Sequence, residues 1–315
     1  MPEMSYAEAL SQALVEIMEQ EPRAVLIGGA FGPLGKRFAN RIKQPPIAEL
    51  GYCGIAVGAA MTGLRPIVSL GTASFIYEAL PQVLNEASVA RYGSAGQLSV
   101  PVVFHVRVGI RGAGAMQHSA APQPIFWNTP GLQIAVPSSP ADAKGLMLTA
   151  ALRSQDPTIF IDHTRLHRLR GPVPDGPTEV PFGVAQVKRE GKDVTVLATS
   201  VMVPRALEAA EQLAREDGIA AEVVDLRTLV PLDKAAVLAS VAKTGRVLIA
   251  DETQKSCGVG AELAALICEE AFFHLKAPVR RVAIPDVPIP YSKSEEDYVT
   301  PGSHHIMAGV REICR

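Results

Sequence analysis

Glu49 is the first residue whose type and setting suggest chemistry. It is the single charged residue of residues 46–60, a run of mostly small or apolar side chains, and it stands at the start of a predicted helix. A carboxylate in such surroundings is partly desolvated, which suits it to sharing a proton with a ligand nitrogen. The alternative is a carboxylate that only stabilises the amino terminus of its own helix. The spacing alone leaves both roles open.

His118 is the second candidate. It closes the glycine-rich run 112–119, the kind of loop that lets a backbone approach a ligand closely. Arg107 and Arg111 lie near this loop and are candidates to bind an anionic group of a substrate. A structural histidine and solvated loop arginines are the alternatives.

Several common kinds of site are not predicted. Phosphate-binding loops and serine nucleophile elbows have no match, and Gly109, Gly112 and Gly114 are too loosely spaced for a dinucleotide fingerprint. His163 and His167 lie four residues apart, but without carboxylate or cysteine partners they do not predict a metal site. The four cysteines, at positions 53, 257, 268 and 314, have no paired spacing and are expected to be reduced and mostly buried.

The elements that must position these residues alternate between strand-like and helix-like runs. Ser5 and Glu8 form a capping box for a first helix, and Ser139 caps a later one. This alternation predicts an α/β fold of two doubly wound, mostly parallel sheets with helices on both faces. Strands are predicted at 24–27, 67–70, 100–106, 158–162, 194–199, 221–225, 247–250 and 279–283, and further helices at about 74–91, 139–154, 204–216, 233–243 and 260–275.

Length and composition predict two domains. At 315 residues the chain is long enough for two cores, and the proline-rich stretch 171–185 reads as a linker between domains at 1–170 and 186–315. The four strands of the second domain are expected to be parallel. A net charge of −2 without a basic patch argues against a nucleic-acid partner.

The composition also predicts association with other chains. Apolar residues make up 48% of the sequence and charged ones only 20%, so part of the surface is expected to be covered in an oligomer. A membrane span is not predicted, because the longest uncharged stretch, 119–141, contains five prolines. The amino terminus lacks the features of a signal or transit peptide, which predicts a cytoplasmic protein.

Taken together, the motifs resemble one known family. The runs 49–66, 75–92, 117–119, 130–132, 137–138 and 141–146 resemble the beta subunits of thiamine-diphosphate-dependent 2-oxo acid dehydrogenases, including the pyruvate, branched-chain and acetoin enzymes. The runs 225–233, 258–262 and 285–291 resemble the transketolase-like carboxyl-terminal domain of the same subunits. The resemblance implies a pyrimidine-binding domain followed by a transketolase carboxyl-terminal domain.

The resemblance also implies roles for individual residues. Glu49 matches the carboxylate that hydrogen-bonds the aminopyrimidine ring and favours the imino tautomer, through which the thiazolium ylide forms. His118 matches a histidine that faces the substrate. Phe75 matches an aromatic residue that packs on the pyrimidine, and the positions that line the same pocket are Ile47, Ala48, Gly71, Ile76, Tyr77 and Glu78. A monovalent cation, K⁺ in some members, is expected near Leu152, Ser154 and Asp156.

In this family the cofactor lies between two subunits, and an alpha subunit holds its diphosphate through Mg²⁺. The Gly-Asp-Gly motif of that metal site does not occur in this chain. The resemblance therefore implies half an active site in an α₂β₂ heterotetramer, with a second beta subunit and a lipoyl acyltransferase core as further partners. The reaction implied is decarboxylation of a 2-oxo acid, or cleavage of an acyloin, with acyl transfer to lipoyl-lysine. A carboligase that forms carbon–carbon bonds and a non-catalytic scaffold subunit are the alternatives.

Some positions depart from the family pattern. The family tends to have acids at the positions of Gly29, Ser69 and Pro81, glutamines at those of Glu78 and Ala120, and a histidine at that of Asn128. Most of these positions belong to the cofactor and substrate side. The departures leave the substrate and the acyl acceptor open.

Overall fold

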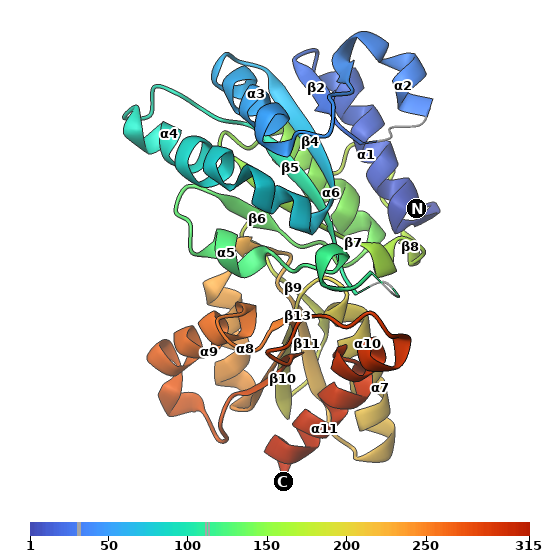
Figure 1. The fold of residues 1–315 in the computed structure, drawn as a ribbon. Coiled ribbons are helices and arrows are strands. Elements are labelled where there is room, and N and C mark those ends of the chain that lie inside the picture. Colours follow the sequence, from blue (N-terminus) through green and yellow to red (C-terminus); the bar gives the residue numbers. More distant parts are fainter. Residues whose placement is uncertain (30–32, 111, 113) are drawn as a thin grey trace. The chain divides into compact units, whose positions relative to one another are not determined.

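The computed structural model describes residues 1–29, 33–110, 112 and 114–315. The chain forms two compact units, one built from Met1–Gly109 and Gln117–Phe182 and the other from Ile110–Met116 and Gly183–Arg315 (Figure 1). The short segment Ile110–Met116 thus belongs with the second unit, although the strand before it belongs to the first. Ile110 explains this membership, because it packs with Ile284, Ile289 and Val299 in the core of the second unit.

The first unit is built on a parallel sheet. Its strands follow the order β6-β7-β5-β4-β2-β3, and every pairing in this series is parallel. Their bounds are β2 Ala24–Ile27, β3 Ile42–Lys43, β4 Arg65–Thr72, β5 Val103–Val108, β6 Gln133–Ala135 and β7 Thr158–His163. A separate antiparallel ribbon joins β1 (Glu3–Ser5) to β8 (Arg170–Pro172). The central strands are buried, as expected for a parallel sheet with both faces covered.

Helices cover both faces of this sheet, as Figure 1 shows. On one face α1 (Tyr6–Gln20) packs against α6 (Pro140–Leu152). The predicted capping box of α1 is present, since Ser5 and Glu8 exchange hydrogen bonds. On the other face α3 (Glu49–Met61) packs on β4 and on the helical turns that follow it. The remaining short elements are α2 Pro33–Arg37, η1 Ala39–Arg41, η4 Met116–His118, α5 Gln123–Trp127 and η5 Thr164–Leu166.

The second unit has a five-stranded sheet in the order β14-β13-β10-β11-β9. The bounds are β9 Gln186–Arg189, β10 Val194–Ala198, β11 Ala221–Asp225, β13 Val247–Gln254 and β14 Arg280–Ile284. The four predicted strands are present and parallel. The sequence did not predict β9, which pairs with β11 in the antiparallel direction and adds an edge strand. Its polar residues carry no buried run that would have marked it.

Two layers of helices cover the second sheet. In one layer α7 (Met202–Glu216) packs against α11 (Ser303–Cys314), and in the other α8 (Lys234–Thr244) meets α9 (Val259–Glu270). Figure 1 shows the two pairs on opposite faces. The shorter elements are β12 Thr228–Val230, η6 Phe272–His274 and α10 Lys293–Val299.

Two sequence expectations need correction. The single helix expected at 74–91 is instead three consecutive segments: a 3₁₀ helix η2 (Ala73–Ala79), a π-helix η3 (Pro81–Ala87) and α4 (Ser88–Gly93). The cysteines are free, but only Cys53 is buried. Cys257 lies in the loop before α9 and Cys268 lies on α9, and both are exposed. No helix of the described residues is long and apolar enough to cross a membrane.

Candidate active site

Strand β4 ends in a bulge at Gly71. In the register with β5, Ser69 pairs with His105 and Thr72 pairs with Arg107. Strand β4 therefore has one more residue than β5 between these two pairs. Gly71 has φ +67°, a left-handed backbone conformation that residues other than glycine adopt only with strain. The bulge places Thr72 at the carboxyl end of β4. In open α/β sheets this edge is where ligands bind.

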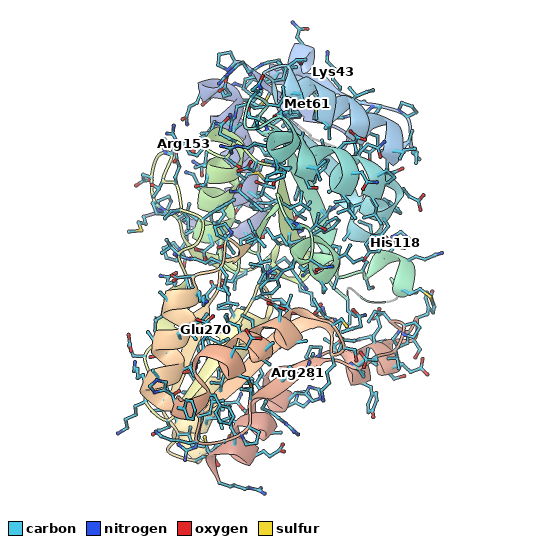
Figure 2. All side chains as sticks on the ribbon, turned by 90° about the vertical axis from the view of Figure 1, so that its left-hand side faces the viewer. Lys43, Met61, His118, Arg153, Glu270 and Arg281 are labelled. Atoms are coloured by element: carbon cyan, nitrogen blue, oxygen red, sulfur yellow. The ribbon has the colours of Figure 1, made fainter. Side chains whose placement is uncertain are left out.

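His118 lies beside the end of β4. Its Nδ1 atom is 3.3 Å from the hydroxyl oxygen of Thr72. The hydroxyl of Ser74 donates a hydrogen bond to the main-chain oxygen of Gln117, which fixes the residue before the histidine. Figure 2 labels His118 on the short helix η4, which projects from the body of the ribbon. Thr72 and Ser74 were not singled out from the sequence, and their place at the end of a predicted strand was the available signal.

The turn after β4 holds the predicted pyrimidine-contacting residue. The ring of Phe75 meets the ring of His118 edge-on, with centroids 5.9 Å apart. Phe75 is 39% exposed, so one side of the ring is open to a ligand or a partner. Ile76 is fully buried in the turn, whereas Glu78 is exposed. Tyr77 is half-buried, and burial raises the pKa of its hydroxyl.

Glu49 is the first residue of α3, as predicted, and is half-buried. The residue before it, Ala48, has no side chain that can cap the helix, so the carboxylate of Glu49 is the acidic group of the first turn. Burial, and after it the negative charge of Glu49, raises the pKa of the Tyr52 hydroxyl. The same two causes raise the pKa of the Cys53 thiol to about 12. Glu49 therefore acts electrostatically on the next turn of its own helix.

Exposed apolar side chains lie before Glu49 in the chain and after it along α3. Ile47 is 96% exposed, Leu50 is 50% exposed and Ile55 is 69% exposed. Gly51 and Gly58, on the same side of α3 as Ile55, are exposed as well. Large exposed apolar side chains along one helix are typical of a surface that another molecule covers.

Arg107 also reaches the bulge. Its Nη2 atom lies 3.6 Å from the point where a Cβ on Gly71 would stand, so the guanidinium lies over the bare backbone of the glycine. The side chain is exposed. Arg111, the second arginine expected to bind an anion, lies outside the described residues.

His163, the last residue of β7, and His167, four residues farther on, have separate partners. Asp162 is buried and its two oxygens contact His105 Nε2 at 3.1 Å and His167 Nε2 at 2.8 Å. Burial opposes ionisation of Asp162, but the hydrogen bonds and charges of both imidazoles outweigh it and hold its pKa well below the usual range. His163 accepts from the main-chain N–H of Arg165. Among the described residues no group of three or more metal-ligating side chains is assembled.

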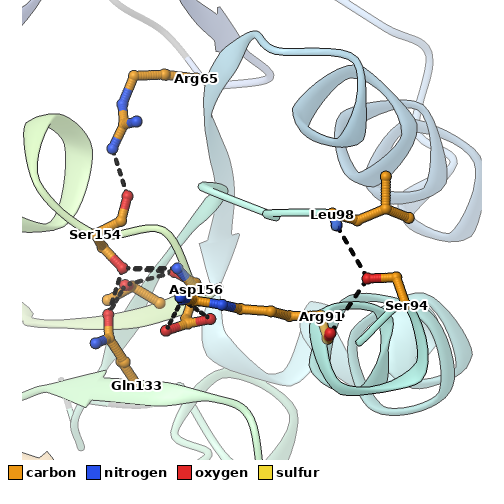
Figure 3. A network of polar contacts seen from close by, with 8 residues as sticks. Arg65, Arg91, Ser94, Leu98, Gln133, Ser154 and Asp156 are labelled. Carbon is orange, nitrogen blue, oxygen red and sulfur yellow. Dashed lines mark hydrogen bonds and ion pairs between the residues drawn. The ribbon is translucent and has the colours of Figure 1, made fainter. Parts of the chain in front are cut away.

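The loop expected to hold a monovalent cation is already tied to two arginines (Figure 3). Arg65 is buried and donates to the main-chain oxygens of Ala151 and Ser154. Arg91 Nη1 lies 2.9 Å from both carboxylate oxygens of Asp156. Leu152, the third residue of the prediction, ends helix α6 beside this loop.

Of the residues predicted for the site, the structure brings Gly71, Phe75 and His118 together around the end of β4. Glu49 and Ala48 lie at the start of α3, which packs on β4 and on η2. The residues near the expected cation belong to a different loop, which follows α6 at the amino-terminal side of β7.

Comparison with known proteins identifies the fold and the family. Residues 2–169 match the pyrimidine-binding domain of transketolase, and residues 183–306 match the transketolase carboxyl-terminal domain. A solved structure described as a split-gene transketolase, an inactive beta4 tetramer, superposes with a TM-score of 0.81 at 26% identity, covering 99% of this chain and 98% of that one. The fold and the cluster at the end of β4 thus define a protein of the transketolase class.

Relatives narrow the class further. The 2-oxoisovalerate dehydrogenase subunit beta of Bacillus subtilis is 42% identical, covering 98% of each chain. The beta subunit of an acetoin:2,6-dichlorophenolindophenol oxidoreductase of Cupriavidus necator is 38% identical over 99% of this chain and 98% of its own. The mitochondrial pyruvate dehydrogenase E1 component subunit beta-2 of rice is 41% identical over 99% of this chain and 86% of its own. The chain belongs to the family of beta subunits of thiamine-diphosphate-dependent 2-oxo acid dehydrogenases.

Proposed function

We propose that this chain supplies the aminopyrimidine-binding half of a thiamine-diphosphate site, in a heteromeric enzyme that decarboxylates a 2-oxo acid or cleaves an acyloin. One observation carries the proposal. Helix α3, which begins at Glu49, packs on β4 and η2, and these elements hold Thr72, Phe75 and the contact to His118. A carboxylate, an open aromatic face and an oriented imidazole are therefore grouped around one strand end.

The residues present fit an aminopyrimidine ring. A flat heteroaromatic ring needs apolar side chains to cover its faces and a charged or polar partner for its nitrogens. Phe75 is partly exposed and Ile47 is almost fully exposed, and both are apolar. Glu49 is half-buried; it lies two residues after Ile47, and its helix α3 packs on η2, which carries Phe75. When bound, the cofactor supplies a carbanion equivalent that adds to the substrate carbonyl.

Each residue then has a definite task. Glu49 holds a proton shared with a ring nitrogen, in the position the sequence resemblance assigns to it. Phe75 packs on the ring and orients it. His118, with Nδ1 anchored by Thr72, presents its ring at a fixed angle and moves or stabilises a proton on the substrate oxygen.

The rest of the enzyme belongs to other chains. We propose an alpha subunit that holds Mg²⁺ and the diphosphate, because this sequence lacks the Gly-Asp-Gly motif of that site. A second beta subunit completes an α₂β₂ assembly, and a lipoyl acyltransferase core receives the acyl group on lipoyl-lysine. The superposed solved structure is described as an inactive tetramer of beta chains, which supports the idea that such a chain is inactive without alpha. We place the enzyme in the cytoplasm, while the rice relative is named mitochondrial.

We also propose that a monovalent cation, K⁺, binds the loop near Leu152, Ser154 and Asp156. The cation takes no part in the proposed reaction. Carbonyl oxygens suit such an ion, but those of Ala151 and Ser154 already accept from Arg65. The test is the melting temperature in KCl and in tetramethylammonium chloride at equal ionic strength. A rise specific to K⁺ supports the cation, and equal values remove it.

The test of the main proposal is Glu49→Gln in the complex reconstituted with its alpha subunit. Glutamine keeps the size of the side chain and removes its charge, so thiamine-diphosphate-dependent turnover is expected to fall about 10²- to 10⁴-fold. Glu86→Gln, which changes an exposed acid on η3, is the matched control and should retain activity. Unchanged turnover in Glu49→Gln would remove the role given to that residue.

A further inference from the structure

Arg107 is a cation at the carboxyl end of β5 that has no partner among the described residues. Its guanidinium is exposed and makes no hydrogen bond or ion pair with any residue that the structure describes. Most other arginines of the first unit are paired, such as Arg23 with Glu21 and Arg153 with Glu179. An unpaired arginine at the ligand-binding edge of a parallel sheet is available to an anion.

The carboxylate that lies opposite Arg107 in the sheet has other partners. Asp162 lies opposite Arg107 in the parallel pairing of β5 and β7. Its two oxygens, however, contact His105 and His167. Asp162 is therefore paired with the two imidazoles, and the charge of Arg107 is not neutralised by its register partner.

Arg107 and His118 meet adjacent residues of the same bulge. Arg107 Nη2 lies 3.6 Å from the point where a Cβ on Gly71 would stand, and His118 Nδ1 lies 3.3 Å from the hydroxyl of Thr72. The main chain of Arg107 is also the register partner of Thr72. The left-handed turn at Gly71 therefore brings a guanidinium and an imidazole to one strand end.

We infer that Arg107 is a specificity residue that binds a carboxylate of the substrate. This inference rests on the proposed function and narrows it, since a 2-oxo acid carries a carboxylate and an acyloin carries none. Arginine binds carboxylates through two parallel N–H groups, which fixes direction as well as charge. The carboxylate is either the group that leaves as CO₂ or a second one farther along the substrate.

The experiment compares Arg107→Gln, Arg107→Lys and the wild-type chain in the complex reconstituted with alpha. Arg23→Gln, an exposed arginine at the amino-terminal side of β2, is the matched control. The substrates are 2-oxobutanoate, 2-oxoglutarate and acetoin. The second readout is the dissociation constant of the unreactive carboxylates butanoate and pentanedioate, measured by calorimetry.

Arg107→Gln is expected to lower kcat/KM for the 2-oxo acid about 10- to 100-fold and to weaken binding of the matching unreactive carboxylate by the same factor. Arg107→Lys should have values between those of Arg107→Gln and the wild-type chain. The kcat/KM for acetoin should change less than about twofold. A loss with both acids identifies the leaving carboxylate, and a loss with 2-oxoglutarate and pentanedioate alone identifies a distal one. Equal losses with acids and acetoin, no loss at all, or a wild-type enzyme that uses only acetoin would overturn the inference. Binding of butanoate and pentanedioate tests Arg107 even where the wild-type complex turns over none of the three substrates, so failure of this inference and failure of the proposed function are distinguishable.

Discussion

The hydroxyl of Thr72 lies 3.3 Å from Nδ1 of His118, so the end of β4 orients the imidazole that faces the candidate site. A contact to one ring nitrogen of a histidine fixes the direction in which the other ring nitrogen points. The loop that carries His118 is held a second time, where Ser74 donates to the main-chain oxygen of Gln117. The histidine is therefore placed by the strand end and by the turn that follows it.

Thr72→Val tests this relationship. Valine keeps the shape of threonine and removes the hydroxyl, so the fold should persist while His118 loses its anchor. We expect kcat of the reconstituted enzyme to fall about 5- to 10-fold, the value of one hydrogen bond, and its pH profile to shift. Thr72→Ser should restore most of the rate. A valine variant with the wild-type rate and pH profile would show that the contact has no part in catalysis.

Gly71→Ala separates strain from function. A Cβ at Gly71 would meet only Arg107 Nη2 at 3.6 Å, an ordinary contact, so the cost comes from φ +67° and is about 1–2 kcal/mol in unfolding free energy. Because relaxation of the bulge would move Thr72, we expect activity to fall more than tenfold. Gly63→Ala is the control, since Gly63 has φ +100° and open space around it. It should lose similar stability by urea unfolding and keep its activity.

The sequence predicted the sheets because buried strands and capped helices leave local patterns. The parallel runs of both units, the capping box at Ser5 and the helix start at Glu49 were all readable from residue type and spacing. The 3₁₀ and π segments that replace the helix at 74–91 were not, because helical periodicity does not distinguish them over so few turns. The antiparallel strand β9 was missed for lack of an apolar pattern.

Candidate residues for the site could be named from the sequence, but the contacts between them could not. Glu49 and His118 stood out as a carboxylate and a loop histidine, and the resemblance added Phe75 to them. The contact between Thr72 and His118 depends on a bulge that shifts the register by one residue. No local sequence pattern predicts this bulge. In the same way, His105 and Asp162 lie 57 positions apart and meet only because β5 pairs with β7.

Asp162→Asn tests the acid dependence of stability. The two imidazoles hold the pKa of Asp162 below its unfolded value, so its contribution is complete above about pH 4 and is lost as the pH falls through the lowered folded pKa. The variant should lose about 3–5 kcal/mol of unfolding free energy at pH 7 and show a weaker acid dependence. Asp156→Asn, which breaks the partly exposed pair with Arg91, should cost less than about 1 kcal/mol. Urea unfolding between pH 3 and pH 7 checks both, and equal costs would contradict the buried role of Asp162.

Ile55→Glu tests whether α3 is a contact surface between chains. Ile55 is 69% exposed and lies between the exposed Gly51 and Gly58, where a partner helix could approach the backbone closely. A position exposed in the single chain tolerates glutamate without loss of the fold, so the variant should keep the circular dichroism spectrum of the wild-type chain. A buried charge in an interface is costly, so we expect the chain expressed alone to shift from oligomer to smaller species in light scattering after size exclusion. Val187→Glu, on β9 of the second unit, adds the same charge at an exposed apolar residue elsewhere and should leave the oligomer intact. A variant at Ile55 that keeps the wild-type mass would place the interface on another face.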